Sequence, residues 1–527
     1  MNNTGLLEKR FAGLAAAFAL GGIFLFLVSC GGRSSGEKAE AAAYRREIHI
    51  ALTAQPPTLD SAMTVSQVAL QISNHIFEQL YNLNADYTPV PELAESVTVS
   101  SDGLNYTFPL RRGVYFHNGK ELRAEDVTAS MNRWLKNSSR AKALLTNSKF
   151  EELDPYTVRL TVEYPASDIL IVLATWAQFP GIMPREIIEA VEDGQTVTEY
   201  IGTGPYKFGE WKQDQYIRLD RYEQYKSRSE APSGFSGAKS APTEYLYFYF
   251  VTDQSTRVAG LKTGQYDVTS IPTENYEEFE QDPNITIHPV PGGVLSAYFN
   301  TRQGPLANLK LRQAALAVFN NTEILLASFS NPKLYFLNPG FTNPAQTQWL
   351  VDAGKERYNE AAREKAKQLM AEAGYRGETI TILATPDYSE MYNASLVIQE
   401  ELRQAGFTVN LVSYDFPTWL KTKSDLSTWD IFVASTGYQL TPPQLLAVTP
   451  DWAGLQNDTV SRGLRTIRSA SDGAAAKQEW AKVQQFLYDY AAATSIGHYT
   501  SSVGTKKTIE GFESFLAPVL WNARLPE

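Results

Sequence analysis

The sequence has only one cysteine and five histidines in 527 residues, so several common kinds of site are missing from it. A single cysteine excludes an intramolecular disulfide and a cysteine-rich zinc site. The histidines lie far apart, no two have the spacing of metal ligands on one helix, and the chain contains no His-Glu-x-x-His sequence. We therefore expect neither a metal site nor another cofactor.

Positive charge is also scarce, with 47 Lys and Arg against 58 Asp and Glu and a net charge of −11. No run of Lys and Arg is longer than two residues. Proteins that bind nucleic acid need clustered cations along the phosphate backbone, so nucleic acid is not an expected partner. The hydrophobic content of 43% is that of a globular chain, and its length favours roughly three domains.

Two patterns of catalytic chemistry are absent as well. No Gly-x-Ser-x-Gly sequence occurs, which argues against a serine hydrolase elbow. The glycine-rich stretch 202–209 has neither the spacing of a dinucleotide loop nor the Gly-Lys-Ser/Thr end of a Walker loop. Carboxylates are plentiful, so a secreted hydrolase that uses a pair of them remains the alternative from a different class of protein.

The N-terminus has the features of an export and anchoring signal. Lys9 and Arg10 precede an apolar run of 18 residues, Phe11 to Val28, and Cys30 follows it closely. This arrangement resembles a bacterial lipoprotein signal, which implies removal of residues 1–29 and lipidation of Cys30; the alternative is an uncleaved membrane anchor. Residues 30–44 are small and polar and would form a flexible tether. We expect a membrane-tethered, extracytoplasmic protein, in the periplasm or on the outer face of the cell membrane of a one- or two-membrane host.

Hydrophobic periodicity predicts a β-rich first part of the body and an α/β second part. Alternation over Glu47–Leu52 indicates a strand, and apolar residues at every fourth position predict a helix over Gln67–Leu80. Further on, a strand at Ile380–Ala384, a helix at 388–405 and a strand at Phe407–Tyr414 form a βαβ pattern. Such a unit predicts parallel strands with a right-handed crossover.

Four blocks of sequence, in this order, resemble one protein family. They are Pro91–Ser96 with Ser101–Phe108 and Leu110–Gly119; Gly202–Phe208 with Leu219–Tyr225; Leu261–Val268; and Ala297–Asn300 with Leu311–Ala315. Together they resemble the family 5 bacterial extracellular solute-binding proteins of the oligopeptide- and dipeptide-binding type, the receptors of ABC importers. The resemblance spans about Ile48 to Pro526.

The resemblance implies an α/β fold, a periplasmic-binding-protein-like clamshell of class II type with two α/β lobes joined by a hinge. Lobe I would take residues 45–66, 183–271 and 493–527, an inserted domain II would take 67–182, and lobe II (domain III) would take 272–492. It also implies a monomeric binding protein without enzymatic activity. Such a protein captures a solute, here a peptide or peptide-like molecule, between its lobes and delivers it to an ABC permease with its ATPase subunits, or feeds a sensor instead.

One position departs from the family pattern. Peptide-binding members commonly place an Asp after the strand that corresponds to Asp430–Ala434, where it pairs with the free amine of the peptide. Here residues 435–443 are STGYQLTPP, and no acidic residue lies between Asp430 and Asp451. Burying an ammonium without a counter-charge is costly. Either another carboxylate replaces the Asp, or the ligand lacks that amine, as an oligosaccharide or a metal chelate would.

Candidate ligand-binding residues follow from their places at strand ends and near the crossings between lobes. They are Ala54, Gln55, Trp176, Gln178, Tyr298, Asn300, Trp419, Ser435, Thr436 and Tyr438. The aromatic members could stack on a ligand, but core packing is the competing explanation for each of them in a chain with 28 Tyr and 9 Trp.

Overall fold

The structure is a computed structural model that describes residues 43–470 and 472–527. The predicted signal of residues 1–29, the lipidation site Cys30 and nearly all of the predicted tether lie outside the described residues. Residues 43–527 form one compact unit, and the description below concerns this unit.

A long mixed β-sheet runs through the described unit. Its strands are β1 (Glu47–Leu52), β8 (Tyr206–Lys212), β9 (Tyr216–Arg221), β10 (Tyr245–Phe250), β11 (Val268–Ile271), β12 (Ile285–Phe299), β13 (Tyr335–Phe336), β14 (Thr379–Ala384), β15 (Thr408–Ser413), β16 (Ile431–Thr436) and β17 (Ala493–Lys506). They lie in the order β15-β14-β16-β12-β17-β11-β1-β10-β9-β8, and β13 pairs with β17. Strand β1 is parallel to β10 and β11, and β14 is parallel to β15 and β16.

Two large hydrophobic cores form in the described chain, and each defines a lobe. Lobe I is built on the core that takes residues from Ile48 to Val268 and from Val503 to Ala523, and Leu440 packs in it as well. Lobe II is built on the core that runs from Leu295 to Ile496. Its helices are α8 (Leu309–Ala317), α9 (Asn321–Phe329), α10 (Arg363–Ala373), α11 (Ser389–Ala405), α12 (Phe416–Lys423), α13 (Pro450–Ala453), α14 (Asp458–Arg468) and α15 (Gly473–Asp489). A small third cluster packs α6 (Gln254–Thr263) and α7 (Tyr276–Glu280) against strands β11 and β12.

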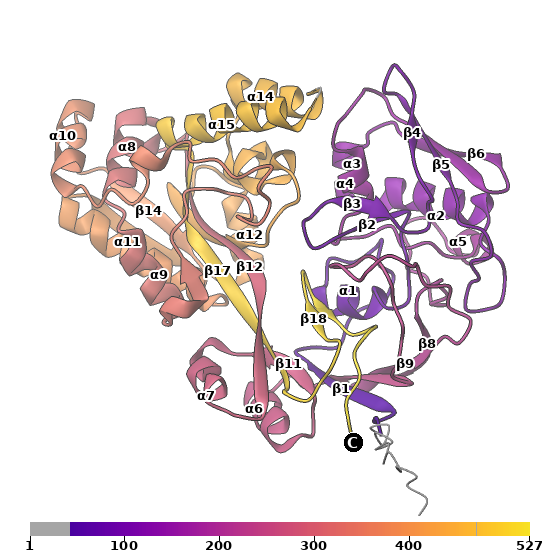
Figure 1. The fold of residues 1–527 in the computed structure, drawn as a ribbon. Coiled ribbons are helices and arrows are strands. Elements are labelled where there is room, and N and C mark those ends of the chain that lie inside the picture. The colour runs from indigo at the N-terminus through magenta and orange to yellow at the C-terminus, as the bar shows by residue number, and fades with distance from the viewer. Residues whose placement is uncertain (1–42, 471) are drawn as a thin grey trace, which may run out of the picture. The chain divides into compact units, whose positions relative to one another are not determined.

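Residues 67–182, called the inserted region below, form the purple part of Figure 1 that carries a second sheet. Its elements are α1 (Gln67–Ser73), β2 (Tyr81–Leu83), β3 (Pro89–Pro91), β4 (Thr98–Val99), β5 (Asn105–Pro109), α2 (Ala124–Asn137), α3 (Ser139–Leu144), β6 (Lys149–Asp154), β7 (Thr157–Thr161) and α4 (Ile169–Leu173), followed by α5 (Arg185–Glu189). The antiparallel sheet β4-β5-β7-β6 packs on α2. The apolar residues of this region belong to the same core as lobe I, and the predicted domain boundaries remain a prediction.

Strands β12 and β17 connect the two lobes. They pair with each other from Ile285 opposite Lys506 to Tyr298 opposite Ala493, and in Figure 1 they run together from lobe II down to the sheet around β1. Their register shifts between Pro291 and Gly293, which is the signature of a β-bulge. The C-terminal hairpin of β18 (Glu513–Ser514) and β19 (Pro518–Val519) then returns to lobe I.

The elements predicted from periodicity are present with one correction. Strand β1 has the predicted bounds, and β14, α11 and β15 form the predicted parallel unit. The helix predicted over Gln67–Leu80 is wrong in length, because α1 ends at Ser73. The carbonyls of His75 and Ile76 accept hydrogen bonds from the backbone of Tyr206 and Gly204 instead of continuing the helix.

The glycines of the 202–209 stretch explain this close contact. A Cβ at Gly202 would lie 2.1 Å from the Ile76 carbonyl oxygen, and a Cβ at Gly204 would lie 2.6 Å from that of His75. Side chains at these positions would therefore prevent the backbones from meeting. The stretch serves packing between the inserted region and β8, consistent with its failure to match a phosphate loop.

Candidate functional site

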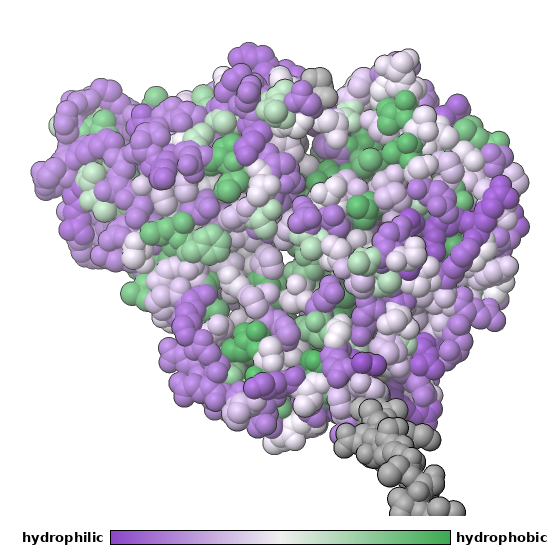
Figure 2. Space-filling model, viewed as in Figure 1, coloured by the Kyte–Doolittle hydropathy of each residue, from purple (hydrophilic) through white to green (hydrophobic). Residues whose placement is uncertain are grey.

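A cavity of about 460 Å³ is lined by residues of both lobes and is called the main cavity below. Lobe I and the inserted region contribute Gln67, Arg140, Thr175, Trp176, Ala177 and Leu516; lobe II contributes Gly437, Tyr438, Gln439 and Leu440; and β12 and β17 contribute Val290, Pro291, Gly292, Tyr499 and Ser501. In the space-filling view the surface is hollowed between the lobes, with hydrophobic side chains beside the hollow (Figure 2). The volume falls within the ~300–1,000 Å³ typical of small-ligand sites.

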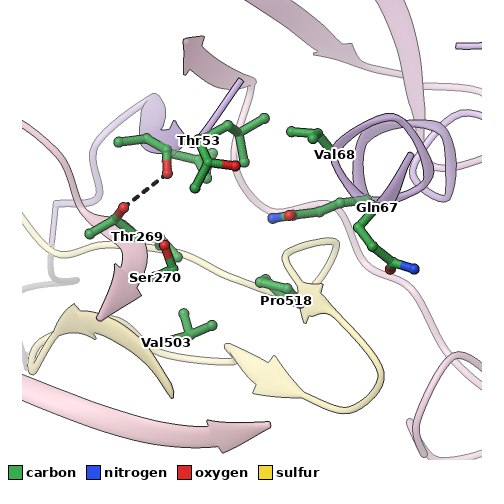
Figure 3. Close-up of a pocket in the computed structure, with 12 residues that line it drawn as sticks. Thr53, Gln67, Val68, Thr269, Ser270, Val503 and Pro518 are labelled. Carbon is green, nitrogen blue, oxygen red and sulfur yellow. Dashed lines mark hydrogen bonds between the residues drawn. The ribbon is translucent and has the colours of Figure 1, made fainter. Parts of the chain in front are cut away.

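A smaller side pocket of about 170 Å³ lies next to the main cavity and shares Gln67 with it. Thr53 follows the end of β1, Thr269 and Ser270 come from β11, and Pro518 comes from the C-terminal hairpin (Figure 3). The hydroxyl of Thr269 donates to the Ala51 carbonyl. The pocket thus lies at the carboxyl ends of two parallel strands, the edge at which open α/β sheets bind ligands.

The bulge in β12 brings the connecting strands to the wall of the main cavity. A Cβ at Gly292 would lie 2.4 Å from the ring of Tyr499, and a Cβ at Gly293 would lie 2.1 Å from the Thr436 carbonyl oxygen. Glycine is therefore required for the ring of Tyr499 to cover this part of the strand. The segment that connects the lobes is therefore also part of the cavity lining.

Aromatic side chains on the walls are held by specific hydrogen bonds. The Trp176 indole donates to Gln67 Oε1 at 3.0 Å, and its ring lies 5.0 Å from that of Phe235. On the opposite wall, Tyr438 Oη lies 2.8 Å from His498 Nδ1, and His498 Nε2 lies 2.9 Å from the Gly340 carbonyl oxygen. Burial lowers the pKa of His498 to about 4, so the ring is neutral near pH 7. Because a carbonyl can only accept, Nε2 carries the proton and Tyr438 donates to Nδ1.

The charge of the lining comes from one side chain. Among the described residues that line the main cavity and the side pocket, Arg140 is the only charged one. Its guanidinium donates to Gln444 Oε1 at 2.8 Å and to Gln439 Oε1 at 3.0 Å, which links α3 to lobe II. Burial lowers its pKa to about 10, and no carboxylate of the described chain forms an ion pair with it.

Other contacts also join the lobes around the cleft. Arg468 of α14 forms an ion pair with Asp168 at 3.1 Å, and it donates to the Leu144 carbonyl. The Asn343 amide donates to the hydroxyl of Tyr87 at 2.7 Å. These polar contacts join the lobes together with Leu440 of lobe II, which packs in the core of lobe I.

Some residues predicted from sequence lie at this cleft. Trp176 and Tyr438 line the main cavity. The Ser435 hydroxyl lies 3.2 Å from Tyr499 Oη, just behind the cavity wall. Ala54 and Gln55 follow Thr53 of the side pocket, but the Gln55 side chain hydrogen-bonds to Gln213 and to the backbone of Asp214.

Other predicted residues have structural contacts instead. Trp419 is fully buried, and its indole donates to the Leu383 carbonyl, because α12 turns this side chain onto the lobe II core. Asn300 donates to the carbonyls of Leu426 and Trp429. Gln178 accepts at its side-chain oxygen from the start of α3. The structure does not bring these three side chains to the cavity.

Tyr298 and Thr436 line a separate crevice of about 10 Å³ behind the main cavity. A single water needs ~10–15 Å³ of such volume, so this crevice has no room for a solute. Both residues are therefore supports of the wall rather than parts of the main cavity.

The sequence reasoning missed Gln67, Arg140, Gln439 and Tyr499. Gln439 lies next to the predicted Tyr438, and Tyr499 lies close to the predicted second crossing between lobes. Both could therefore have been predicted from their positions in the sequence. Arg140 had none, because it reaches the cleft only through the packing of the inserted region against lobe II.

Neither a membrane span nor a metal centre is found in the part of the chain that the structure describes. No described helix combines the length and the apolar character needed to cross a bilayer. No described group of three or more His, Cys, Asp or Glu side chains could hold a metal ion.

Comparisons with known proteins agree with this architecture. The model of the bacterial extracellular solute-binding proteins, family 5, matches residues 88–449. A probable peptide ABC transporter periplasmic-binding protein of Sinorhizobium fredii is 28% identical over 493 residues, covering 88% of this chain and 90% of its own. A glutathione-binding protein of Salmonella choleraesuis is 26% identical over 395 residues, covering 73% and 72%.

The fold is also that of a solved structure, the ABC transporter substrate-binding protein CtaP of Listeria monocytogenes. It superposes with a TM-score of 0.79 at 22% identity, over 92% of this chain and all of the other. This confirms the predicted periplasmic-binding-protein fold. Because the family model covers well over half of the chain, the resemblance found in the sequence is confirmed too. The chain belongs to the family 5 bacterial extracellular solute-binding proteins, which serve ABC transporters as extracytoplasmic substrate-binding proteins and are not enzymes.

Proposed function

We propose that this protein captures a peptide or peptide-like solute in the main cavity and presents it to an ABC permease with its ATPase subunits. The observation that carries the proposal is the composition of the cavity wall, to which lobe I, lobe II and both connecting strands contribute. A solute bound there contacts all the parts that move relative to one another. It therefore stabilises the closed arrangement, which a permease can distinguish from the open one.

The peptide-type ligand is supported by the relatives and by the lining. One relative is named for peptide transport and another for glutathione, itself a tripeptide. Gln67, Gln439 and Tyr499 offer uncharged donors and acceptors that suit amide groups, while Trp176 offers an apolar face. An oligosaccharide or a metal chelate is the second candidate, because the amine-binding Asp is missing. With no metal-ligand cluster among the described residues, a metal would have to arrive with its chelator.

The proposal includes a lipid anchor. Cys30 follows the apolar run of the N-terminal signal, and residues 30–44 would hold the body at the membrane next to the permease. Diacylation together with acylation of the new N-terminus gives a stable multi-chain anchor. We propose that the protein acts as a monomer, with lobe rotation about β12 and β17.

A carboxylate-dependent hydrolase, the alternative from another class, is not supported. Such an enzyme needs two carboxyl groups that flank the scissile bond. Neither the main cavity nor the side pocket has an acidic side chain in its described lining. Together with membership in a family of transport proteins, this makes the hydrolase hypothesis wrong.

Native mass spectrometry of the protein purified gently from its own host tests the proposal. We expect one bound solute per chain, with the mass of a short peptide or a peptide-like compound, and no product formed from it on incubation. A saccharide or a metal-bearing mass would favour the second candidate. Stoichiometric binding that survives replacement of both Trp176 and Tyr438 by Ala would contradict the main cavity as the site.

The anchor is tested by metabolic labelling with a radioactive fatty acid. The wild-type chain should take up label and partition into the membrane fraction. Replacement of Cys30 by Ala should abolish labelling. Equal labelling of both would contradict lipidation at this residue.

A further inference from the structure

We propose that the main cavity selects small solutes that carry a carboxylate and no free ammonium group, with the carboxylate bound by Arg140. The inference rests on the proposed function and names the charge of the solute. It starts from the described lining of the cleft, in which Arg140 is the only charged side chain of the main cavity and of its side pocket.

Arg140 is half-buried, and no carboxylate of the described chain pairs with it. Its two described partners, Gln439 and Gln444, are neutral amides that offer dipoles rather than a negative charge. Burial lowers its pKa to about 10, with no opposing charge to raise it. Removing a cation from water is costly unless an anion compensates, so a solute that covers the half-buried guanidinium binds better when it brings a negative group.

Arginine is well suited to the group proposed. Its planar guanidinium binds a carboxylate through two parallel N–H···O bonds, which fixes orientation as well as charge. Because Arg140 reaches from α3 to lobe II, a carboxylate at this place would contact the residue that joins the lobes. The charge of the solute and the closure of the cleft would then be coupled through the same guanidinium.

The same lining disfavours an ammonium group. No carboxylate lines the described cavity, and a second cation near Arg140 would meet repulsion at low dielectric. The carboxylate to consider is Glu390 in α11. It lies near enough to raise the pKa of Tyr499 further, after the larger effect of burial, although it does not line the cavity. Glu390 is therefore the residue that would bind an amine if the proposal were wrong.

Four matched probes separate these cases. N-acetyl-alanyl-alanine is an anion without an ammonium group, and its C-terminal amide is neutral. Alanyl-alanine is a zwitterion, and alanyl-alaninamide is a cation. Thermal unfolding and titration calorimetry of the full-length protein with each compound should show that the acetylated acid binds at least about tenfold more tightly than the other three.

Variants identify the residue responsible. Arg140→Gln should reduce binding of the acetylated acid by at least about tenfold, and Arg140→Lys should restore part of it. Lys142→Gln is the matched control, since Lys142 is an exposed cation on the same short helix that does not line the cavity. Neither Lys142→Gln nor Glu390→Gln should change the affinity.

The outcomes that would overturn the proposal are distinct from failure of the proposed function. Tighter binding of alanyl-alanine or alanyl-alaninamide, or loss of binding in Glu390→Gln, would leave a peptide receptor with the opposite charge preference. Unchanged affinity in Arg140→Gln would also reject the assignment while leaving the receptor role intact. If none of the four compounds stabilised the wild-type protein, the peptide-type solute of the proposed function would be wrong, and this inference with it.

Discussion

Two cations, Lys239, which is buried in lobe I, and Arg140, which is half-buried at the cleft, have opposite kinds of partner. Lys239 Nζ lies 2.5 Å from Glu92 Oε1 and 3.6 Å from Glu78 Oε1, and it faces the ring of Trp521 at 4.9 Å. Burial alone would lower the pKa of Lys239, but these two carboxylates outweigh burial and raise it. Arg140 is half-buried, and the side-chain oxygens that accept hydrogen bonds from it are amide oxygens of lobe II.

The difference indicates that Lys239 has a structural role with fixed partners, whereas Arg140 can change its partners when the cleft opens. The carboxylate partners of Lys239 lie in the inserted region, which shares one core with lobe I, so we expect them to stay together when the lobes separate. Arg140 makes its contacts across the cleft, so separation of the lobes would break them and expose the guanidinium further. A charge that must alternate between water and a ligand cannot be paired within its own lobe.

The largest effect expected from this comparison is loss of stability in Lys239→Met. Removing the ammonium takes away the cation that pairs with Glu78 and Glu92 and leaves only the charge of Arg111 to oppose these two buried carboxylates. Breaking a buried ion pair from one side typically costs about 3–5 kcal/mol. Urea denaturation followed by circular dichroism should show a loss of this size in the free energy of unfolding.

The matched change at the cleft is Arg140→Met, which leaves no carboxylate unpaired. We expect a change of less than about 1 kcal/mol in the free energy of unfolding, because only bonds to neutral amides are lost. Equal losses in the two variants would show that the two cations are not distinguished by their partners.

Features of the fold that depend on local contacts could be predicted from the sequence, whereas those that depend on long-range contacts could not. The strand at 47–52 and the parallel unit around α11 follow from local periodicity, and local periodicity survives in the fold. Arg140 could not be found, because its role arises from a contact between α3 and residues about 300 positions later in the chain. Trp419 could be placed near a strand end but not oriented, because the direction of α12 is set by tertiary packing.

A second contrast concerns the two aromatic side chains Trp419 and Tyr438, both predicted from sequence to contact the ligand. Trp419→Ala should lower the free energy of unfolding by about 3 kcal/mol or more, because it empties a fully buried site in the lobe II core. Tyr438→Ala should cost less stability and should weaken binding of the co-purified solute, because the side chain lines the main cavity. Denaturation and calorimetry on both variants measure the two effects. Reduced affinity in a folded Trp419→Ala protein, with Tyr438→Ala unaffected, would reverse their assignment.

The last contrast concerns the contribution of buried histidines in the two lobes to the free energy of unfolding at acidic pH. Burial lowers the pKa of His75, His117 and His498 to about 4. In the unfolded chain a histidine titrates near its usual pKa of ~6.5, so between these values the unfolded state binds more protons than the folded one. Each residue therefore stabilises the fold above pH ~6.5, and this contribution is lost as the pH falls towards 4, by about 2 kcal/mol at pH 5.

The variant His498→Gln measures the part of this pH-dependent loss of stability that comes from the histidine at the cleft. The loss of stability between pH 7 and pH 5 should be smaller in this variant than in the wild-type protein by about 2 kcal/mol, because one titrating group is removed. His288→Gln is the control: His288 is only partly buried and its pKa is lowered less, so its removal should change the difference less. Denaturant titrations at the two pH values measure both. An unchanged difference in His498→Gln would mean that the ring behind Tyr438 reaches water in the folded protein. In that case His498 would titrate with the opening of the cleft and not with unfolding, unlike His75 in the core of lobe I.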